Sequence, residues 1–258
     1  MKSSLPLCLI ALACLLALAT IALPPPVARA QSETKESAPQ PEAEKATAGA
    51  PTSTVYKPPL RGAPATRVGG GTRNTGSKIL TLSALAPNEA GYTVSDKPTL
   101  YWYLSESLDT PVELTITPTG KLQEATPPVL EITLKPPVAR GVHALRLADH
   151  GVVLKPGVEY QWFVAVISNP AQRSNDVVAG GSIIRIADSA IPAQLRQVPE
   201  ARWPAVYAEG GVWYDAIDQL SRSISAQPAD RQLRQQRAAL LEQVGLPEAA
   251  AFDRSAAR

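Results

Sequence analysis

Few side chains of this sequence are suited to catalysis. Its only cysteines are Cys8 and Cys14, and its only histidines are His143 and His150. Nucleophilic catalysis needs a nucleophile, a base and an orienting acid, and no Gly-x-Ser-x-Gly turn supplies a serine. The histidines also lack the spacing of a zinc motif. We therefore expect no catalytic residue, cofactor or metal ion, although two carboxylates that converge in space remain an open alternative.

An anion is the ligand most directly suggested by residue types. Arg67 and Arg73 lie in a stretch rich in glycine and proline. A phosphate-binding loop requires Gly-x4-Gly-Lys-Ser/Thr, whereas Gly71-x4-Gly76 is followed by serine and then lysine, and no strand precedes it. Backbone N–H groups together with Arg67 or Arg73 would suit an anion or a partner. The alternative is a glycine-rich lead-in that packs along the first strand.

The first thirty residues have the pattern of a secretory signal peptide. A positive start precedes an almost unbroken apolar run from Leu5 to Leu23, and Ala28-Arg29-Ala30 is a small-x-small cleavage site. We expect cleavage after Ala30, with a retained membrane anchor as the alternative. Both cysteines lie in this segment, so the mature chain has no thiol. The prediction is a periplasmic or secreted protein of the bacterial envelope, with no membrane insertion after cleavage.

The charge of the mature chain argues against nucleic acid as a partner. The full sequence has 25 basic and 23 acidic residues, and removal of Lys2 and Arg29 leaves 23 of each. A net charge of zero gives no overall attraction to nucleic acid or anionic lipid. Residues 31–64 are rich in alanine, proline and polar residues with few large apolar side chains, which predicts a disordered linker.

Between residues 65 and 188, apolar and polar residues alternate in short runs that are separated by turn residues. The runs 112–117 and 130–135 each have one apolar face. Strands are predicted at 79–85, 98–105, 111–118, 129–135, 141–148, 158–168 and 180–187. Seven short strands without helical periodicity between them predict an antiparallel β-sandwich with a Gly/Arg-rich lead-in. Trp102 and Trp162 are the expected core tryptophans.

One strand carries a more specific pattern. The spacing Leu154-x-Pro-Gly-x-x-Tyr160 resembles the tyrosine corner of fibronectin type III and immunoglobulin-like sandwiches. We expect the Tyr160 hydroxyl to bond to the backbone near Leu154. Apolar residues on both faces of the run that ends at Val166 predict an inner strand. The predicted fold class is mainly β with an α-helical C-terminus: an Ig-like or fibronectin III-like antiparallel β-sandwich followed by a small helical module.

After residue 188 the apolar period changes from 2 to 3.6. A helix is predicted from about Val212 until Pro228 stops it, and a second helix is expected between a cap at Asp230 and Gly245. We predict a helical module over 189–247 and a flexible tail over 248–258. The exposed arginines of the second helix are expected to form a solvated face.

The helical module suggests where a partner would bind. From Tyr207 to Pro228 the spacing resembles a single tetratricopeptide-like unit. A lone unit cannot form the usual concave peptide groove. The helices are therefore expected either to cap the sandwich or to dock a partner helix, with Trp203 and Trp213 as the docking residues.

Four stretches in combination resemble a known family. They are the glycine-arginine lead-in, Lys97-Pro-Thr-Leu-Tyr-Trp-Tyr103, the strand that contains Tyr160, and Tyr207-Ala-Glu-Gly-Gly-Val-Trp-Tyr-Asp215. Together, over about residues 58–247, they resemble an exported bacterial family catalogued as domain of unknown function 928. The family has no assigned activity, so the resemblance implies an envelope location and no particular chemistry.

We predict a non-enzymatic exported envelope protein that acts through contact with an unidentified envelope protein. The alternative is a module that binds a glycan or wall polymer, in which exposed Tyr92, Tyr101 or Tyr103 would stack on sugar rings. Buried rings would contradict that alternative, because stacking requires an accessible aromatic face.

Overall fold

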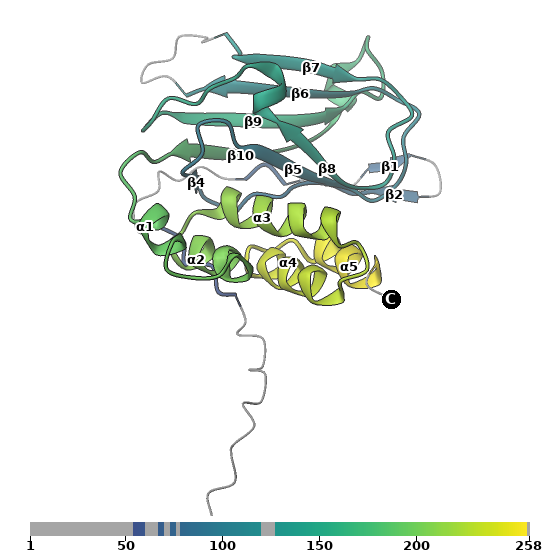
Figure 1. The fold of residues 1–258 in the computed structure, drawn as a ribbon. Coiled ribbons are helices and arrows are strands. Elements are labelled where there is room, and N and C mark those ends of the chain that lie inside the picture. Colours follow the sequence, from purple (N-terminus) through teal and green to yellow (C-terminus); the bar gives the residue numbers. More distant parts are fainter. Residues whose placement is uncertain (1–53, 60–66, 70–72, 76–77, 120–126, 257–258) are drawn as a thin grey trace, which may run out of the picture. The chain divides into compact units, whose positions relative to one another are not determined.

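The strands of the chain come first and its helices follow (Figure 1). The computed structural model describes residues 54–59, 67–69, 73–75, 78–119 and 127–256, all within the unit Ala50–Arg258. The predicted signal peptide and the linker other than 54–59 lie outside the described residues. In the described part, the fold is mainly β with a helical C-terminal region, as the sequence predicted.

Each predicted strand is found, with shifts at its ends. The strands are β1 (Arg73–Thr75), β2 (Lys78–Leu80), β3 (Leu82–Ala84), β4 (Gly91–Thr93), β5 (Thr99–Leu104), β6 (Val112–Pro118), β7 (Leu130–Leu134), β8 (Gly141–Arg146), β9 (Glu159–Val166) and β10 (Val177–Arg185). The first predicted strand is split into β2 and β3, and β10 begins three residues early. Strands β1 and β4 were not predicted, because three residues are too few to establish a period.

The strands form two larger sheets and one small hairpin. The five-stranded sheet has the order β4-β10-β9-β6-β7, the three-stranded sheet has the order β3-β5-β8, and β1 pairs with β2. All these pairs are antiparallel except β10 with β4, which is parallel. Strand β9 lies between β10 and β6, which confirms it as an inner strand.

Strand β5 is buried on both faces, one of which is covered by the helices. All six of its residues are buried. On one face, Trp102 stacks on His143 of the adjacent strand, with ring centroids 4.1 Å apart. On the other face, the hydroxyl of Tyr101 donates to Asp218 Oδ1 in the helical region at 2.8 Å, and Tyr103 lies against Phe252. The three-stranded sheet therefore packs directly against the helices.

The predicted turn at the start of β9 is confirmed. The N–H of Lys155 donates to the Tyr160 hydroxyl oxygen at 3.1 Å, and Gly157 has a φ of +71° that favours glycine. The ring of Tyr160 is buried, as are Trp102 and Trp162. Tyr160 and Trp162 of β9 are thus part of the hydrophobic core.

The helical region consists of short helices that continue to the end of the described chain. They are α1 (Ile191–Leu195), α2 (Trp203–Glu209), α3 (Trp213–Ala226), α4 (Arg231–Gln243) and α5 (Pro247–Ala256), with 3-10 turns η1 (Leu147–His150), η2 (Arg173–Asn175) and η3 (Glu200–Arg202). The Asp230 side chain accepts from the N–H groups of Gln232 and Leu233, which confirms the predicted cap of α4. No helix in the described residues is long and apolar enough to cross a membrane.

The helices cap the strands, which is one of the two arrangements that the sequence left open. Helix α3 packs on β4 and β5, and in Figure 1 the helices gather on one side of the strands. Tyr214 of α3 reaches furthest: its hydroxyl donates to the carbonyl of Ser182 at 3.0 Å and accepts from Trp162 Nε1 at 2.9 Å. One helix side chain thereby joins both β9 and β10.

The predicted flexible tail is wrong, because residues from Pro247 to Ala256 form α5. Its Asp253 is fully buried and accepts two hydrogen bonds from Arg237 of α4, at 2.6 and 2.7 Å. Arg237 is only 4% exposed, so this arginine does not belong to a solvated face. A buried ion pair joins α4 to a helix that the sequence had not suggested.

The predicted linker also contains a packed segment. In residues 54–59, Tyr56 is 9% exposed and its ring meets Trp213 edge-on, with centroids 4.9 Å apart. The N–H of Tyr56 donates to Gln243 Oε1 at 2.8 Å, and the N–H of Lys57 donates to the carbonyl of Ala208 at 3.0 Å. The prediction of disorder is wrong for this segment because its few apolar and backbone groups find partners on three helices.

Candidate functional site

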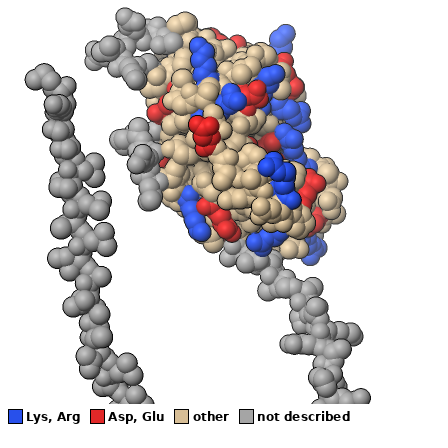
Figure 2. Space-filling model, turned by 60° about the vertical axis from the view of Figure 1, so that its left-hand side comes forward, with Lys and Arg blue, Asp and Glu red and all other residues tan. Residues whose placement is uncertain are grey.

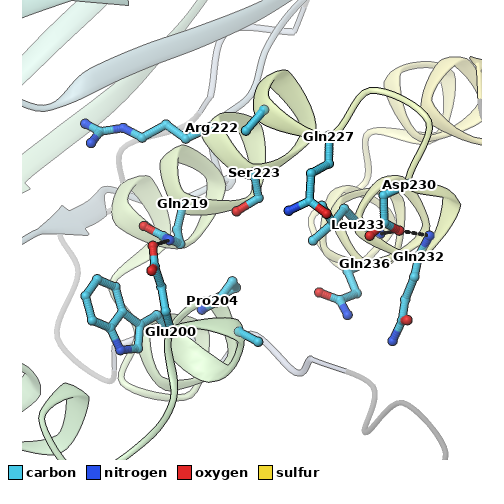
Figure 3. Close-up of a pocket in the computed structure, with 13 residues that line it drawn as sticks. Glu200, Pro204, Gln219, Arg222, Ser223, Gln227, Asp230, Gln232, Leu233 and Gln236 are labelled. Atoms are coloured by element: carbon cyan, nitrogen blue, oxygen red, sulfur yellow. Dashed lines mark hydrogen bonds between the residues drawn. The ribbon is translucent and has the colours of Figure 1, made fainter.

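A groove of about 660 Å³ lies among η3, α2, α3 and the start of α4. We call it the glutamine groove, because Gln219, Gln227, Gln232 and Gln236 are among its lining residues. Figure 3 shows Gln219 and Ser223 on α3 facing Pro204 of α2, with Leu233 and Gln236 of α4 across the space. Three helices that are consecutive in the sequence thus supply its walls.

The polar groups of the groove fall into two sets. Glu200 Oε1 accepts from Gln219 Nε2 at 3.0 Å, so these two side chains hold each other in place. By contrast, the side-chain amides of Gln227, Gln232 and Gln236 have no hydrogen-bond partner among the residues that the structure describes. A primary amide carries two donors and an acceptor. The groove therefore presents several uncommitted groups of both kinds.

The groove has few charged side chains, and each of them already has a partner within the protein. Asp230 Oδ1 accepts from the N–H of Gln232 at 2.8 Å as the cap of α4. Arg222 pairs with Asp218, with Nη2 and Oδ2 2.8 Å apart, and in Figure 3 its side chain extends away from the centre of the groove. Because its charged side chains are already paired or hydrogen-bonded, this site is suited to hydrogen bonding rather than to acid–base chemistry.

Trp203, a predicted docking residue, lies in the wall of this groove. Its side chain is half-buried, and its indole Nε1 is buried without a hydrogen-bond partner in the described part of the chain. Tryptophan is enriched at the energetically important centres of protein interfaces. Trp203 therefore remains a candidate contact residue.

Trp213, the other predicted docking residue, is occupied within the fold. It is 0% exposed, and its Nε1 donates to the carbonyl of Leu85 at 2.8 Å. Its ring also packs against Tyr56. Trp213 therefore docks the helices on the strands and offers no surface to a partner.

Arg67 binds the protein's own backbone. Its Nη1 donates to the carbonyls of Ala86 at 3.0 Å and Val244 at 2.8 Å, and its Nη2 donates to Gly245 at 3.1 Å. The last two carbonyls lie just past α4, where helices leave acceptors unpaired. Burial lowers the pKa of Arg67. The structure thus places both Nη atoms of Arg67 on backbone carbonyls, and the prediction of an anion or partner contact at Arg67 stays a prediction.

Arg73 is placed only by its backbone. It lies in β1 opposite Leu80 in the hairpin with β2. Its side chain is outside the described part of the structure, so the prediction that it contacts an anion or partner stays a prediction.

The tyrosines proposed to stack on sugars are mostly inaccessible. Tyr101 and Tyr103 are 8% and 6% exposed. Burial raises the pKa of both phenols, and Asp218 adds to the effect at Tyr101. Tyr92 is half-buried. Glycan stacking on Tyr101 and Tyr103 is therefore wrong, because α3 and α5 cover these two rings.

The surface has no dominant charge on the side shown in Figure 2. Basic and acidic side chains are interspersed there, with wide uncharged areas between them. Within the described residues, no group of three or more His, Cys, Asp or Glu side chains could hold a metal ion. The site that stands out is an amide-rich groove with little charge, which no local sequence motif marks.

Comparison with models of known protein families gives a match. The model of a family described as Domain of Unknown Function (DUF928) matches residues 68–252, more than half of the chain. The matched range contains both larger sheets and extends into α5. No curated protein matches the sequence.

Proposed function

The chain belongs to the family described as Domain of Unknown Function (DUF928), and from its geometry we propose that it is an exported, non-enzymatic envelope protein that binds a segment of a partner protein. The observation that carries the proposal is the glutamine groove with its uncommitted amides. The apolar run and small-x-small site before Gln31 support export.

The proposed fold is an Ig-like or fibronectin III-like sandwich with a helical cap. In such sandwiches strands A, B and E share one sheet, and strands C, F and G share the other. Taking β3, β5 and β8 as A, B and E leaves β6, β9 and β10 as C, F and G, and the sheet orders agree with this assignment. The hydrogen bond from Lys155 to Tyr160 at the start of β9 supports the same identification.

The proposed occupant is an extended polypeptide segment. Its backbone presents N–H donors and C=O acceptors in turn, which the amides of Gln227, Gln232 and Gln236 can match. Pro204 and Leu233 supply apolar contacts beside these amides. The volume of about 660 Å³ lies within the range of roughly 300–1,000 Å³ that ligand sites occupy.

The groove favours a protein segment over a glycan. Sugar recognition relies on accessible aromatic faces, and Tyr101 and Tyr103 are buried beneath the helices. The aromatic lining residue of the groove is Trp203, at one side of it. The protein partner is therefore the better-supported function.

Site-specific photocrosslinking tests this proposal in the native envelope. A benzoylphenylalanine at Gln236 should give an adduct that maps to one segment of one protein, while the same group at the exposed Gln197 outside the groove should not. A synthetic peptide of that segment should then bind the purified protein. Ser223→Arg, which fills the groove, should weaken this binding at least tenfold, while Gln197→Arg leaves it unchanged.

Two results would overturn the proposal. One is an identical set of adducts from Gln236 and Gln197, which would mark random encounters. The other is peptide binding that is indifferent to Ser223→Arg in a protein whose thermal unfolding is unchanged.

A further inference from the structure

A second groove, of about 700 Å³, runs between β8 and the helices α3 to α5. We call it the arginine groove. Its lining includes the five arginines Arg140, Arg146, Arg222, Arg234 and Arg237. No acidic residue of the described chain is among its lining residues. The near-neutral sequence therefore conceals a local concentration of positive charge.

Only part of this charge is neutralised nearby. Asp253 holds Arg237 through two hydrogen bonds, and its Oδ1 lies 3.9 Å from Nη1 of Arg234. Asp218 pairs with Arg222. Five guanidinium groups thus face two carboxylates, which leaves an excess of about three positive charges.

Two arginines, Arg140 just before β8 and Arg146 at its end, carry most of the uncommitted charge. Arg140 and Arg146 are exposed, and neither forms an ion pair among the described residues. Arg140 lies over the ring of Phe252, with its Cζ 5.8 Å from the centroid. The two flank the helix-facing side of β8 and are six residues apart, which is about 20 Å along a strand. Both can therefore contact a single extended ligand.

Strand β8 is also an open edge. In the described structure it pairs with β5 on one side and with no strand on the other. Gly141, Val142 and Ala144 of this strand line the groove together with the arginines. Exposed edge strands present unpaired N–H and C=O groups that accept an additional strand. An ordered row of backbone groups therefore lies beside the basic side chains.

We propose that the arginine groove binds an acidic, extended segment of a partner protein, which adds as a strand to the free edge of β8. Alternate residues of a strand point to the same face. Acidic residues at every second position would therefore meet Arg140 and Arg146 while the backbone pairs with β8. This groove shares Arg222 and Ala226 with the glutamine groove, but the contacts proposed here, Arg140, Arg146 and the edge of β8, are not part of that groove, so the proposal does not depend on it.

The open strand edge decides between a peptide and an acidic polysaccharide. Arginines alone would attract either polyanion, because Coulombic attraction does not depend on the ligand's backbone. Regularly spaced N–H and C=O groups of a strand edge match a polypeptide chain and not a uronic acid chain. The combination of the two features selects the peptide.

Fluorescence anisotropy with an acetylated (Glu-Val)₄ peptide tests the proposal at low salt. Arg140→Glu with Arg146→Glu should weaken binding at least tenfold. The matched control is Arg196→Glu with Lys155→Glu, which makes the same charge change at exposed positions outside the groove and should retain binding within about twofold. Because all four residues are exposed, thermal unfolding of both double variants should match that of the unmodified protein.

Two further ligands separate strand addition from simple charge attraction. A (Glu-Val)₄ peptide that is N-methylated at every residue keeps every carboxylate but has no N–H to pair on either strand edge, and it should bind at least tenfold more weakly. Tetragalacturonate should also bind more weakly than the unmodified peptide. Equal binding of either ligand would overturn the proposal, as would the absence of peptide binding or an equal loss in the control variant.

Discussion

At the level of single residues, Asp215 is where helix electrostatics and burial oppose each other. It lies in the first turn of α3, where the helix dipole favours a carboxylate, and its Oδ2 accepts from the N–H of Val94 at 3.2 Å. Burial outweighs these contacts and raises the pKa of Asp215 to about 6, and the charge of Asp218 acts in the same direction. Asp215 therefore titrates close to neutral pH where α3 meets β4.

This pKa predicts that the stability contributed by Asp215 falls as pH rises. The folded value of about 6 exceeds the unfolded value of about 3.9, so the contribution is complete below pH 4 and is lost as pH rises through 6. Two pKa units correspond to about 3 kcal/mol. We expect the stability of Asp215→Asn relative to the unmodified protein to increase by about 2–3 kcal/mol between pH 4 and pH 7, as measured by urea unfolding.

A difference measurement is required because another group acts in the opposite sense. Burial lowers the pKa of His143, so its contribution is lost as pH falls. Subtracting the free energy of unfolding of the unmodified protein from that of Asp215→Asn at each pH removes the contribution of His143, because both proteins contain it. Asp188→Asn, which removes a carboxylate at an exposed position, is the matched control. A flat difference for Asp215→Asn would contradict the assignment of this titration to Asp215.

Residues with local partners could be predicted from the sequence, and residues with distant partners could not. The Tyr160 hydroxyl bonds five residues away, and Asp230 caps its own helix. Arg67, by contrast, bonds to Val244, 177 positions further along the chain. No local pattern records such a contact. The residue types of Arg67 and Arg237 suggested a solvated or binding role, whereas the folded chain uses both internally.

At the level of elements, the buried pair Arg237–Asp253 links α5 to α4. Removing one partner of a buried ion pair leaves an uncompensated charge, at a cost of about 3–5 kcal/mol. We expect Asp253→Ala to lower the free energy of unfolding by about this amount, because Arg237 would keep only Ser221 Oγ as a partner, at 2.8 Å. Urea unfolding measures the loss, and hydrogen exchange should show α5 opening first.

A double variant distinguishes lost charge compensation from lost packing. Arg237→Met with Asp253→Leu removes both charges and should recover most of the stability that Asp253→Ala loses. Glu242→Gln, at the exposed pair of Glu242 with Arg254 that joins the same two helices, should cause no measurable change. Equal losses from Asp253→Ala and Glu242→Gln would show that burial does not set the strength of the α4–α5 contact.

The elements that were not predicted from the sequence all have a weak or short local pattern. Strand β4 has three residues and is recognised only through its pairing with β10. Helix α5 is rich in alanine and buries a charged residue, so its apolar stripe is weak. By contrast, β5, β9 and α3 were predicted because their large side chains repeat at a clear period. The two grooves lie between elements, so no single element's pattern could locate them.

At the level of the whole molecule, the strands and helices depend on each other through a few long side chains. Tyr214 of α3 contacts β9 and β10, and Trp213 bonds to the backbone beside β3. The sequence separated a sandwich at 65–188 from a helical module at 189–247, whereas their buried residues form one continuous apolar cluster. Both grooves are shaped by helices whose positions depend on this shared core.

The segment 54–59 should stabilise this shared core, although it precedes every strand. Tyr56 packs on Trp213, and Gln243 of α4 bonds to the backbone of the segment at two positions: it accepts from Tyr56 N–H and donates to the carbonyl of Thr54 at 2.9 Å. A chain that starts at Thr54 should therefore be more stable than one that starts at Leu60. Tyr56→Ala alone should cost about 2–4 kcal/mol, somewhat below the usual loss for a buried aromatic ring because Tyr56 lies near the surface.

Urea unfolding of these chains measures the contribution directly. Lys57→Ala is the matched control. The Lys57 side chain is exposed, and the hydrogen bond to Ala208 is donated by the backbone N–H, which alanine keeps. Because the segment touches α2, α3 and α4, its loss should also increase hydrogen exchange in all three helices and leave β6 and β7 protected. Equal unfolding midpoints for the chains that start at Thr54 and Leu60 would show that the segment packs against the core without stabilising it.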